Sequence, residues 1–245
     1  MESIYRSEFL VDAAHSDCFG RLKPASILYF VQEVAGQHCK ELALDWDTMA
    51  QKRMFWAVIR HRVQITRLPN KGETITVETW PMPTTRVAFP RSVVAYDQDG
   101  NELFRTITIW VLMDLDTRAM ILPGKSGVNV PGLLRGSELA PPKGLVPMSL
   151  SAEERRRVRF TDLDVNGHMN NCRYLDWICD LLPSGFHHSH SIREFTLHYL
   201  EEAREGDTLK LQWQLSHGGQ LRVETVRVSE TDEQEHRIFS ADICF

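Results

Sequence analysis

The chain repeats one structural plan, and this internal repeat limits its fold more than any other feature of its 245 residues. Aligning Gly20 with Gly167 places residues 17–24 over residues 164–171. Both segments come directly before apolar residues spaced three and four apart, a pattern that predicts an amphipathic helix. The apolar positions run over Ile27–Leu42 and Tyr174–Leu182. Pro24 suits the first turn of the first helix, Asn170 or Asn171 suits an N-cap of the second, and Pro183 ends it. A duplicated turn and helix indicates two domains of one kind.

A strand-rich stretch follows each predicted helix. Residues 63–75 and 197–209 share the order strand, turn with Gly and then an acid, strand. Alternating apolar residues and polar turns predict the remaining strands. These strands are expected over Thr74–Trp80, Val87–Tyr96, Glu102–Leu115, Thr208–Leu215, Leu221–Ser229 and His236–Phe245, with a polar turn over Thr231–Glu235. The order predicts an α+β fold, a tandem (double) hotdog in which each domain is a long helix wrapped by an antiparallel β-sheet.

A segment rich in Pro and Gly separates the two halves and shows no periodicity, as is typical of a linker. We therefore expect an N-terminal hotdog domain over residues 1–130 and a linker over 131–152. The C-terminal hotdog domain is expected over residues 153–245.

Composition excludes several classes of function. A net charge of −5 argues against a nucleic-acid partner. The five cysteines are scattered and odd in number, which argues against a disulfide framework or a zinc site. The N-terminus lacks the features of a secretory signal, and no apolar run is long enough to span a bilayer. We expect a cytoplasmic chain without a targeting peptide.

Residues suited to catalysis occur in only one of the two aligned turns. The second turn carries Asp164, Asn166 and His168, whereas the first keeps only the acid. Glu202 likewise corresponds to a Leu in the first half. A spacing of two on an extended segment would place the three side chains of the second turn on one side. The N-terminus of the following helix favours developing negative charge, and a carboxylate or a His can activate water or attack a carbonyl carbon.

The alternative is that these polar residues only cap the helix and complete a turn. The first half argues against this interpretation, because it repeats the turn and the helix without the Asn or the His.

At these residues the chain resembles the acyl-acyl carrier protein (acyl-ACP) thioesterases of plants and bacteria. The resemblance is strongest over Thr161–Trp177 and covers nearly the whole chain. Its other matching segments are Leu197–Glu202, Phe55–Arg60, Pro69–Glu73, Thr79–Trp80 and Trp110–Asp116.

The resemblance implies a double hotdog that releases free fatty acid from acyl-ACP without a metal or an organic cofactor. It places catalytic positions at Asp164, Asn166, His168 and Glu202. Some plant relatives carry a Cys beside that glutamate, whereas this chain has Ala203, so a thiol nucleophile is not expected there.

Our hypothesis is that Asp164 acts as general base or nucleophile and that Glu202 helps to hold and polarise water. Asn166 and His168 would orient the carboxylate or stabilise the oxyanion. A hotdog acyl-CoA thioesterase and a non-catalytic acyl-binding hotdog protein are the alternatives. A serine thioesterase is disfavoured because the chain has no G-x-S-x-G motif.

Three weaker signals remain. Arginines before the signature could dock the acidic carrier or form an ordinary solvated strand edge; they are Arg155, Arg156, Arg157 and Arg159. Residues after the first helix could line an acyl pocket or form ordinary core; they are Trp46, Met54, Phe55 and Trp56. His187, His188 and His190 are expected in a polar loop and not in a metal site. Both a monomer and a homodimer fit the sequence.

Overall fold

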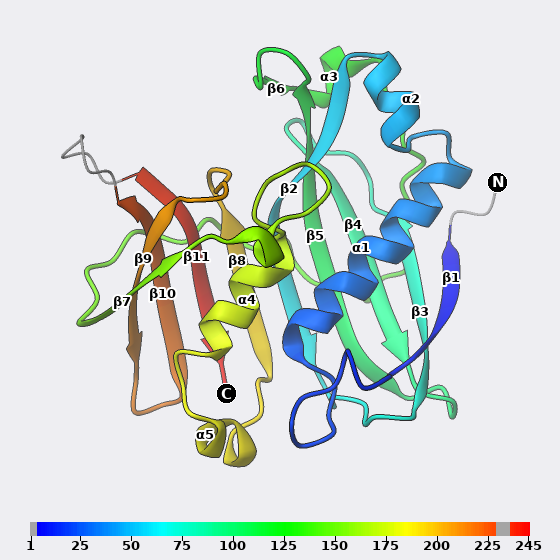
Figure 1. The fold of residues 1–245 in the computed structure, drawn as a ribbon. Helices are drawn as coiled ribbons and strands as arrows, with labels where there is room; N and C mark the ends of the chain where they lie inside the picture. Colours follow the sequence, from blue (N-terminus) through cyan, green and yellow to red (C-terminus); the bar gives the residue numbers. More distant parts are fainter. Residues whose placement is uncertain (1–3, 229–235) are drawn as a thin grey trace. The chain divides into compact units, whose positions relative to one another are not determined.

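The computed structural model describes residues 4–228 and 236–245. The chain divides into two compact units, Met1–Pro142 and Lys143–Phe245 (Figure 1). The boundary between the units falls within the segment that was expected to be a linker. Within the described residues, no helix is long and apolar enough to cross a membrane.

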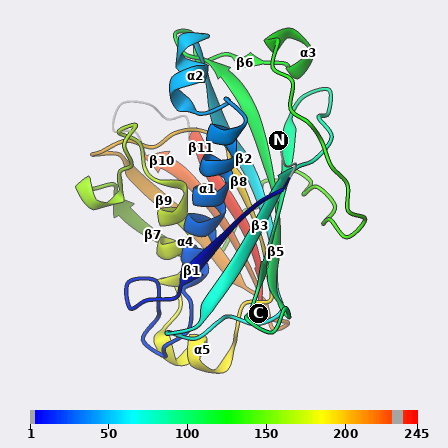
Figure 2. The same ribbon diagram turned by 90° about the vertical axis from the view of Figure 1, so that its right-hand side faces the viewer.

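The first unit is an antiparallel sheet with one long helix on one face. The strands lie in the order β1 (Tyr5–Leu10), β3 (Thr74–Pro81), β4 (Phe89–Tyr96), β5 (Glu102–Asp114) and β2 (Met54–Ile65), and β6 (Met120–Ile121) pairs with β5. Figures 1 and 2 show α1 (Pro24–Glu41) lying across one face of this sheet. Two short helices, α2 (Trp46–Gln51) and α3 (Pro123–Ser126), complete the unit.

The residues of α1 explain both its start and its position. Pro24 occupies the first turn, where its fixed φ suits a helix and its missing N–H costs nothing. Apolar residues three and four apart then bury one side, namely Ile27, Leu28, Val31, Val34 and Ala35. His38 and Lys40 lie in the last turn, where positive charge suits the helix dipole.

The second unit repeats this arrangement with a shorter helix. The strands lie in the order β8 (Glu194–Tyr199), β11 (His236–Cys244), β10 (Gln220–Val228), β9 (Thr208–Leu215) and β7 (Ala152–Arg157). The helix α4 (Asn171–Cys179) packs on the sheet through Tyr174, whose ring centroid lies 4.7 Å from that of Phe239 on β11. A 3₁₀ turn, η1 (Phe160–Asp162), precedes the signature loop.

Several local expectations were wrong in their detail. Pro24 begins α1 and Asn170 caps α4, as expected, whereas α4 ends at Cys179, before Leu182. The segment after Pro183 is not a loop, because Ser184–Ser189 forms the helix α5. The expectations also missed β1, α2 and β7, together with the short elements β6, α3 and η1. The polar turn expected over Thr231–Glu235 lies outside the described residues, as does Ser229.

The segment 131–142 has no regular secondary structure, yet it covers the sheet face opposite α1. Leu139 is 8% exposed and packs on the β5 side chains Ile107, Ile109 and Val111. Arg105 Nη1 also donates to the backbone carbonyl of Ser137 at 2.6 Å. This part of the expected linker therefore belongs to the core of the first unit.

Candidate active site

The turn before α4 has the same backbone geometry as the turn before α1. In each turn the N–H of the acid, Asp164 or Asp17, donates to the carbonyl four residues later, at 2.8 Å and 2.7 Å respectively. The glycine of each turn has a positive φ, 73° at Gly167 and 77° at Gly20. This conformation is costly for residues with a Cβ. The structure thus supports the alignment of the two halves residue by residue.

The two aspartates differ in the hydrogen bonds that their second carboxylate oxygen, Oδ2, accepts. Asp164 Oδ1 accepts the N–H of Asn166 at 2.8 Å and that of His168 at 3.4 Å. Asp17 Oδ1 accepts the two equivalent N–H groups, both at 2.9 Å. The Arg21 guanidinium then occupies Asp17 Oδ2, at 3.1 Å and 3.2 Å. Among the described residues, Asp164 Oδ2 has no hydrogen-bond donor, so this oxygen is available to a substrate or a water molecule.

His168 faces a different carboxylate. Its Nε2 lies 3.1 Å from Glu202 Oε2. The two residues meet because the signature loop pairs with the loop that follows β8: Met169 N donates to Ala203 O at 2.8 Å, and His168 forms a β-bridge with Arg204. The His168 side chain is 17% exposed and that of Glu202 is 43% exposed. Glu202 therefore holds the imidazole with one oxygen while its carboxylate remains accessible to water.

The spacing argument for these residues was wrong, although the structure does bring Asp164 and His168 together. Residues 164–168 form a turn and not an extended segment, because Gly167 N donates to Asp164 O at 3.0 Å. The bond from Asp164 N to His168 O closes the turn and leaves the exposed Asn166 at its tip. Hydrogen bonding across the turn, and not a period of two, is what gathers these groups.

Asp162 holds the signature loop against α4, and the sequence did not reveal this role. This residue is 5% exposed, and its carboxylate accepts Arg173 Nε at 3.2 Å and Trp177 Nε1 at 3.3 Å, both from α4. Its backbone carbonyl accepts Asn170 N at 2.8 Å. The aligned residue of the first half is His15, so the repeat alone carried no signal for this role.

Cys172 is the cysteine of the signature run, and its surroundings do not favour reactivity. The side chain is fully buried at the start of α4, and burial raises its pKa well above the usual range. Only thiolates are good nucleophiles, so this residue is inert at neutral pH.

The arginine run does not form one surface. It comprises Arg155, Arg156, Arg157 and Arg159. Arg156 is only partly exposed, and it pairs with Glu154 at 2.6 Å and Asp180 at 2.9 Å. Arg155 and Arg157 point to the other face of β7 and are exposed, and Arg159, which follows the strand, is exposed as well.

The structure also places the histidine run. His187 and His188 belong to the last turn of α5, and His190 follows directly. His187 Nε2 lies 2.8 Å from the carbonyl of Cys179, and the His190 ring stacks on Phe186. The His187 contact ties α5 to the end of α4, whereas the His190 contact lies within α5 and its C-cap.

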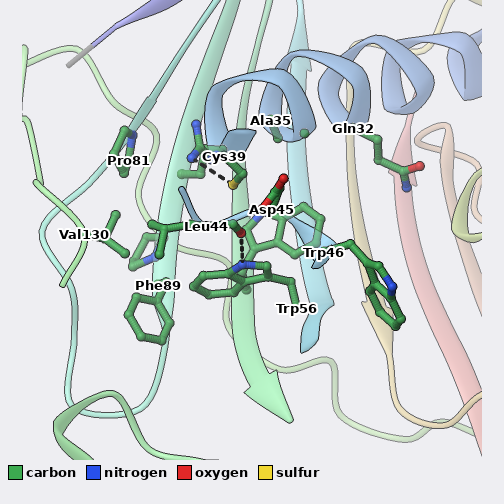
Figure 3. A pocket seen from close by; sticks show the side chains of 14 residues that line it. Gln32, Ala35, Cys39, Leu44, Asp45, Trp46, Trp56, Pro81, Phe89 and Val130 are labelled. Carbon is green, nitrogen blue, oxygen red and sulfur yellow. Dashed lines mark hydrogen bonds between the residues drawn. The ribbon is translucent and has the colours of Figure 1, made fainter. Parts of the chain in front are cut away.

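The first unit contains a cavity of about 180 Å³ beside α1 (Figure 3). Ala35 and Gly36 of α1 lie on one side of it. Aromatic rings form much of the remaining wall, namely Trp46, Trp56, Phe89 and Trp110. Of the four residues expected at an acyl pocket, Trp46 and Trp56 thus line this cavity. Met54 and Phe55 lie outside its lining.

Packing explains why these two residues are elsewhere. Met54 is 6% exposed and packs in the core with Met49 and Leu112. Phe55 points to the other face of β2, where the Arg118 guanidinium lies 4.4 Å from its ring centroid.

A buried cation also lines the cavity. Arg91, on β4, is 6% exposed. Its guanidinium lies 3.0 Å from His38 Nδ1, 3.2 Å from Thr79 Oγ1 and 3.7 Å from Cys39 Sγ. Burial lowers the pKa of Arg91 and raises that of the Cys39 thiol. These contacts tie α1 to β3 and β4, a role that sequence reasoning missed because an arginine on a strand usually faces solvent.

Comparison with known families covers most of the chain. A model of the acyl-ACP thioesterase N-terminal domain matches residues 2–122, and one of the acyl-ACP thioesterase C-terminal domain matches residues 147–241. A chloroplastic palmitoyl-acyl carrier protein thioesterase of Gossypium hirsutum is 27% identical over 76% of this chain and 48% of its own length. A chloroplastic oleoyl-acyl carrier protein thioesterase of Coriandrum sativum is 24% identical over 84% of this chain and 61% of its own length. The chain thus spans about half to three fifths of these relatives.

Solved structures confirm the expected fold. An acyl-ACP thioesterase from Bacteroides thetaiotaomicron superposes with a TM-score of 0.88 at 23% identity, over 99% of this chain and 98% of that one. The 12:0-ACP thioesterase from Umbellularia californica gives a TM-score of 0.82 at 23% identity, over 100% and 97%. The α+β architecture with a tandem hotdog arrangement is therefore correct.

Proposed function

The chain belongs to the acyl-ACP thioesterase family, and from this premise we propose that it hydrolyses fatty acyl-ACP and releases free fatty acid. The observation that supports this proposal best is the polar group in the second unit. Asp164, with a carboxylate oxygen that accepts no bond among the described residues, stands in the same turn as His168, which pairs with Glu202 at 3.1 Å. The first unit builds the same turn without that pair.

The geometry suits a general-base mechanism. Asp164 Oδ2 takes a proton from water while the water oxygen attacks the thioester carbonyl carbon. Glu202 polarises the water and holds the His168 imidazole. The amide of Asn166 and the imidazole of His168 stabilise the oxyanion. The carbon–sulfur bond then breaks, and the carrier thiol leaves with the proton that Asp164 took up.

A carboxylate that attacks the carbonyl itself is the other form of this chemistry. It would give a mixed anhydride with Asp164, which water then opens. Hydrolysis in water enriched in ¹⁸O under single-turnover conditions tests for direct attack. Label in the Asp164 carboxylate indicates direct attack with water opening the anhydride at the Asp164 carbonyl. Label in the fatty acid alone fits general-base catalysis or an anhydride that water opens at the acyl carbon.

The test of the function is the release of free fatty acid from a panel of acyl-ACPs of different chain length. We expect Asp164→Asn, His168→Ala and Glu202→Gln to lower kcat by about 100-fold or more, the usual contribution of a positioned acid or base. Asp17→Asn is the matched control, because it changes the equivalent carboxylate of a turn that lacks the His and the Glu. Its kcat should stay near that of the wild type.

Three outcomes would contradict the proposal at different levels. Near-normal turnover by Asp164→Asn would remove the role of that residue. Equal rates on matched acyl-ACP and acyl-CoA would remove the preference for the carrier. Acyl-ACP binding without release of fatty acid would favour a non-catalytic acyl-binding protein.

We also propose that the aromatic cavity of the first unit holds the acyl chain. Its walls are mainly apolar, as binding of an alkyl chain requires, and Trp46 and Trp56 belong to them.

A further inference from the structure

The loop that carries Glu202 is fixed at several backbone positions. On one side, Met169 N donates to Ala203 O at 2.8 Å. On the other, Leu200 N donates to Ile238 O at 2.9 Å. The carbonyl of Glu202 itself is bonded by neither contact. It accepts a hydrogen bond from Arg227 Nη2, on β10.

Arg227 reaches three points of the same loop. Besides the Glu202 carbonyl, its Nε donates to Asp207 Oδ2 at 3.0 Å. Its Nη1 lies 3.5 Å from Glu201 Oε2. The Asp207 carboxylate also accepts Arg204 N at 2.9 Å, so the acid and the guanidinium together close the loop. An arginine offers several donors in a rigid plane, which suits such a multiple contact.

The first unit supplies an internal comparison for this contact. Its loop also ends in an acid, Glu73, whose carboxylate accepts Asn70 N at 2.7 Å. A guanidinium again bonds the acid, with two contacts of 2.9 Å, but it belongs to Arg67 within the loop. The same guanidinium lies 3.5 Å from Asp97, which follows β4. In the first unit the loop thus supplies the cation Arg67 and the acid Glu73, and the segment after β4 supplies a second acid, Asp97.

The second unit exchanges these charges. Position 201, aligned with Arg67, is a Glu, and the cation comes from Arg227 on the strand. A guanidinium that reaches in from the strand can bond the backbone carbonyl of residue 202. The aligned position of the first unit is Leu68, where no catalytic side chain needs to be held. The exchange therefore coincides with the appearance of Glu202.

We infer that Arg227 is a positioning residue, which holds the backbone at Glu202 so that its carboxylate stays within hydrogen-bond distance of His168. This inference rests on the proposed function for its effect on catalysis. Arg227 acts through Glu202 and does not touch the reacting atoms. A purely structural role would stabilise the unit without any specific effect on Glu202, and the two roles predict different results.

Kinetics of Arg227 variants separate the two roles. We expect Arg227→Gln to lower kcat on acyl-ACP by on the order of 10-fold to 100-fold with little change in KM, because small misplacements of a catalytic group cost this much. Arg227→Lys keeps a charge near Asp207 but offers no rigid fork, so kcat should fall while the unfolding temperature stays near that of the wild type. Arg67→Gln is the matched control: it removes the equivalent ion pair and should leave kcat unchanged.

A double variant shows whether Arg227 acts through Glu202. If it does, adding Arg227→Gln to Glu202→Gln lowers kcat no further. A full additional loss in the double variant, or normal kcat in both single Arg227 variants, would overturn the inference.

A readout without substrate separates this inference from the proposed function. The ¹⁵N resonance of His168 Nε2 reports its contact with Glu202 directly. We expect it to move in Glu202→Gln and Arg227→Lys alike, and to stay unchanged in Arg67→Gln. If the wild type released no fatty acid from any acyl-ACP, the proposed function would fail, but this measurement would still decide the role of Arg227. An unmoved resonance in Arg227→Lys would contradict it.

Discussion

Position 168 separates the two turns of this protein chemically. In the first unit an arginine neutralises the turn carboxylate from the aligned position, with contacts of 3.1 Å and 3.2 Å. In the second unit His168 contacts Glu202 instead. One change of residue type thus leaves a carboxylate oxygen of Asp164 open and recruits a second carboxylate to the site.

Gly167 offers a test of how closely turn geometry and catalysis are linked. Its φ of 73° disfavours any residue with a Cβ, so Gly167→Ala should lower the free energy of unfolding by about 1 to 2 kcal/mol. It should also lower kcat, because the turn orients Asp164 and His168. Gly20→Ala has the same strain, at φ 77°, in the turn without the pair. Urea unfolding should show similar losses for both variants, and a matching fall of kcat in Gly20→Ala would argue against the link.

His61 gives a pH dependence that a single substitution can isolate. It is fully buried on β2, and burial lowers its pKa from 6.5 to about 3. Below pH 6.5 His61 is protonated in the unfolded chain but stays neutral in the folded state, so the free energy of unfolding falls as the pH falls. From neutral pH to about pH 5 the expected loss is roughly 2 kcal/mol.

Urea unfolding at these two pH values measures the His61 effect. His61→Gln should reduce the loss on acidification, and His217→Gln, at an exposed position, should not. An unchanged loss in His61→Gln would assign the pH dependence to other groups.

At the scale of elements, α1 forms one wall of the proposed acyl pocket. Ala35 lines the cavity, so Ala35→Leu should fill part of it and shift the preference toward shorter acyl chains. Gln37→Leu adds a similar side chain on the exposed side of the same helix and should leave the preference unchanged. The acyl-ACP panel, scored as kcat/KM for each chain length, measures the shift. Identical preferences in the two variants would place the acyl chain elsewhere.

The segment 131–142 shows how an irregular stretch can contribute to a core. Leu139 is 8% exposed against β5, so Leu139→Ala should cost about 2 to 3 kcal/mol, as buried leucines do. Leu134, in the same segment, is 62% exposed. Leu134→Ala should therefore change stability by less than about 0.5 kcal/mol. Equal effects in chemical unfolding would mean that the segment does not pack as a cover.

The elements that could be predicted are those with a local signal. Helical spacing and Pro24 located α1, and the alternation of apolar and polar residues located the central strands. The edge strand β7 was missed because Ala152–Arg157 has almost no apolar residue to alternate. The strand β1 was missed although its sequence alternates: Tyr5, Ser7 and Phe9 are partly buried, and the residues between them are exposed. The segment 131–142 lacked any period, and tertiary contacts such as those of Leu139 and Ser137 reveal its place.

The residues of the candidate site likewise fall into those that the sequence indicated and those that only the structure reveals. The repeat singled out Asn166 and His168 because the two halves differ there, and Asp164 stands in the same turn, although the reason given for their proximity was wrong. The repeat also marked Glu202, which is aligned with Leu68, and the family resemblance implied its catalytic role. Arg227 and Arg91 carried no signal, because their roles depend on contacts between residues far apart in the sequence.

At the scale of the whole molecule, the net charge of −5 repels an acidic carrier, so any steering must come from a local surface. We propose Arg155 and Arg157, both exposed on β7, as part of that surface. Reversing both to Glu should raise KM for acyl-ACP about 10-fold at low salt, and the difference should shrink near 0.5 M salt, where exposed charges are screened.

The control for this prediction must carry the same net charge. Reversal of the exposed Lys71 and Arg86 to Glu, in the first unit, changes the net charge equally but leaves β7 untouched. If docking is local, this variant keeps a KM near that of the wild type at every salt concentration, because the long-range field alone is weak beyond about 10 Å in salt. If both variants raise KM equally, the carrier responds to overall charge. A KM that neither variant changes would assign Arg155 and Arg157 to an ordinary solvated strand edge.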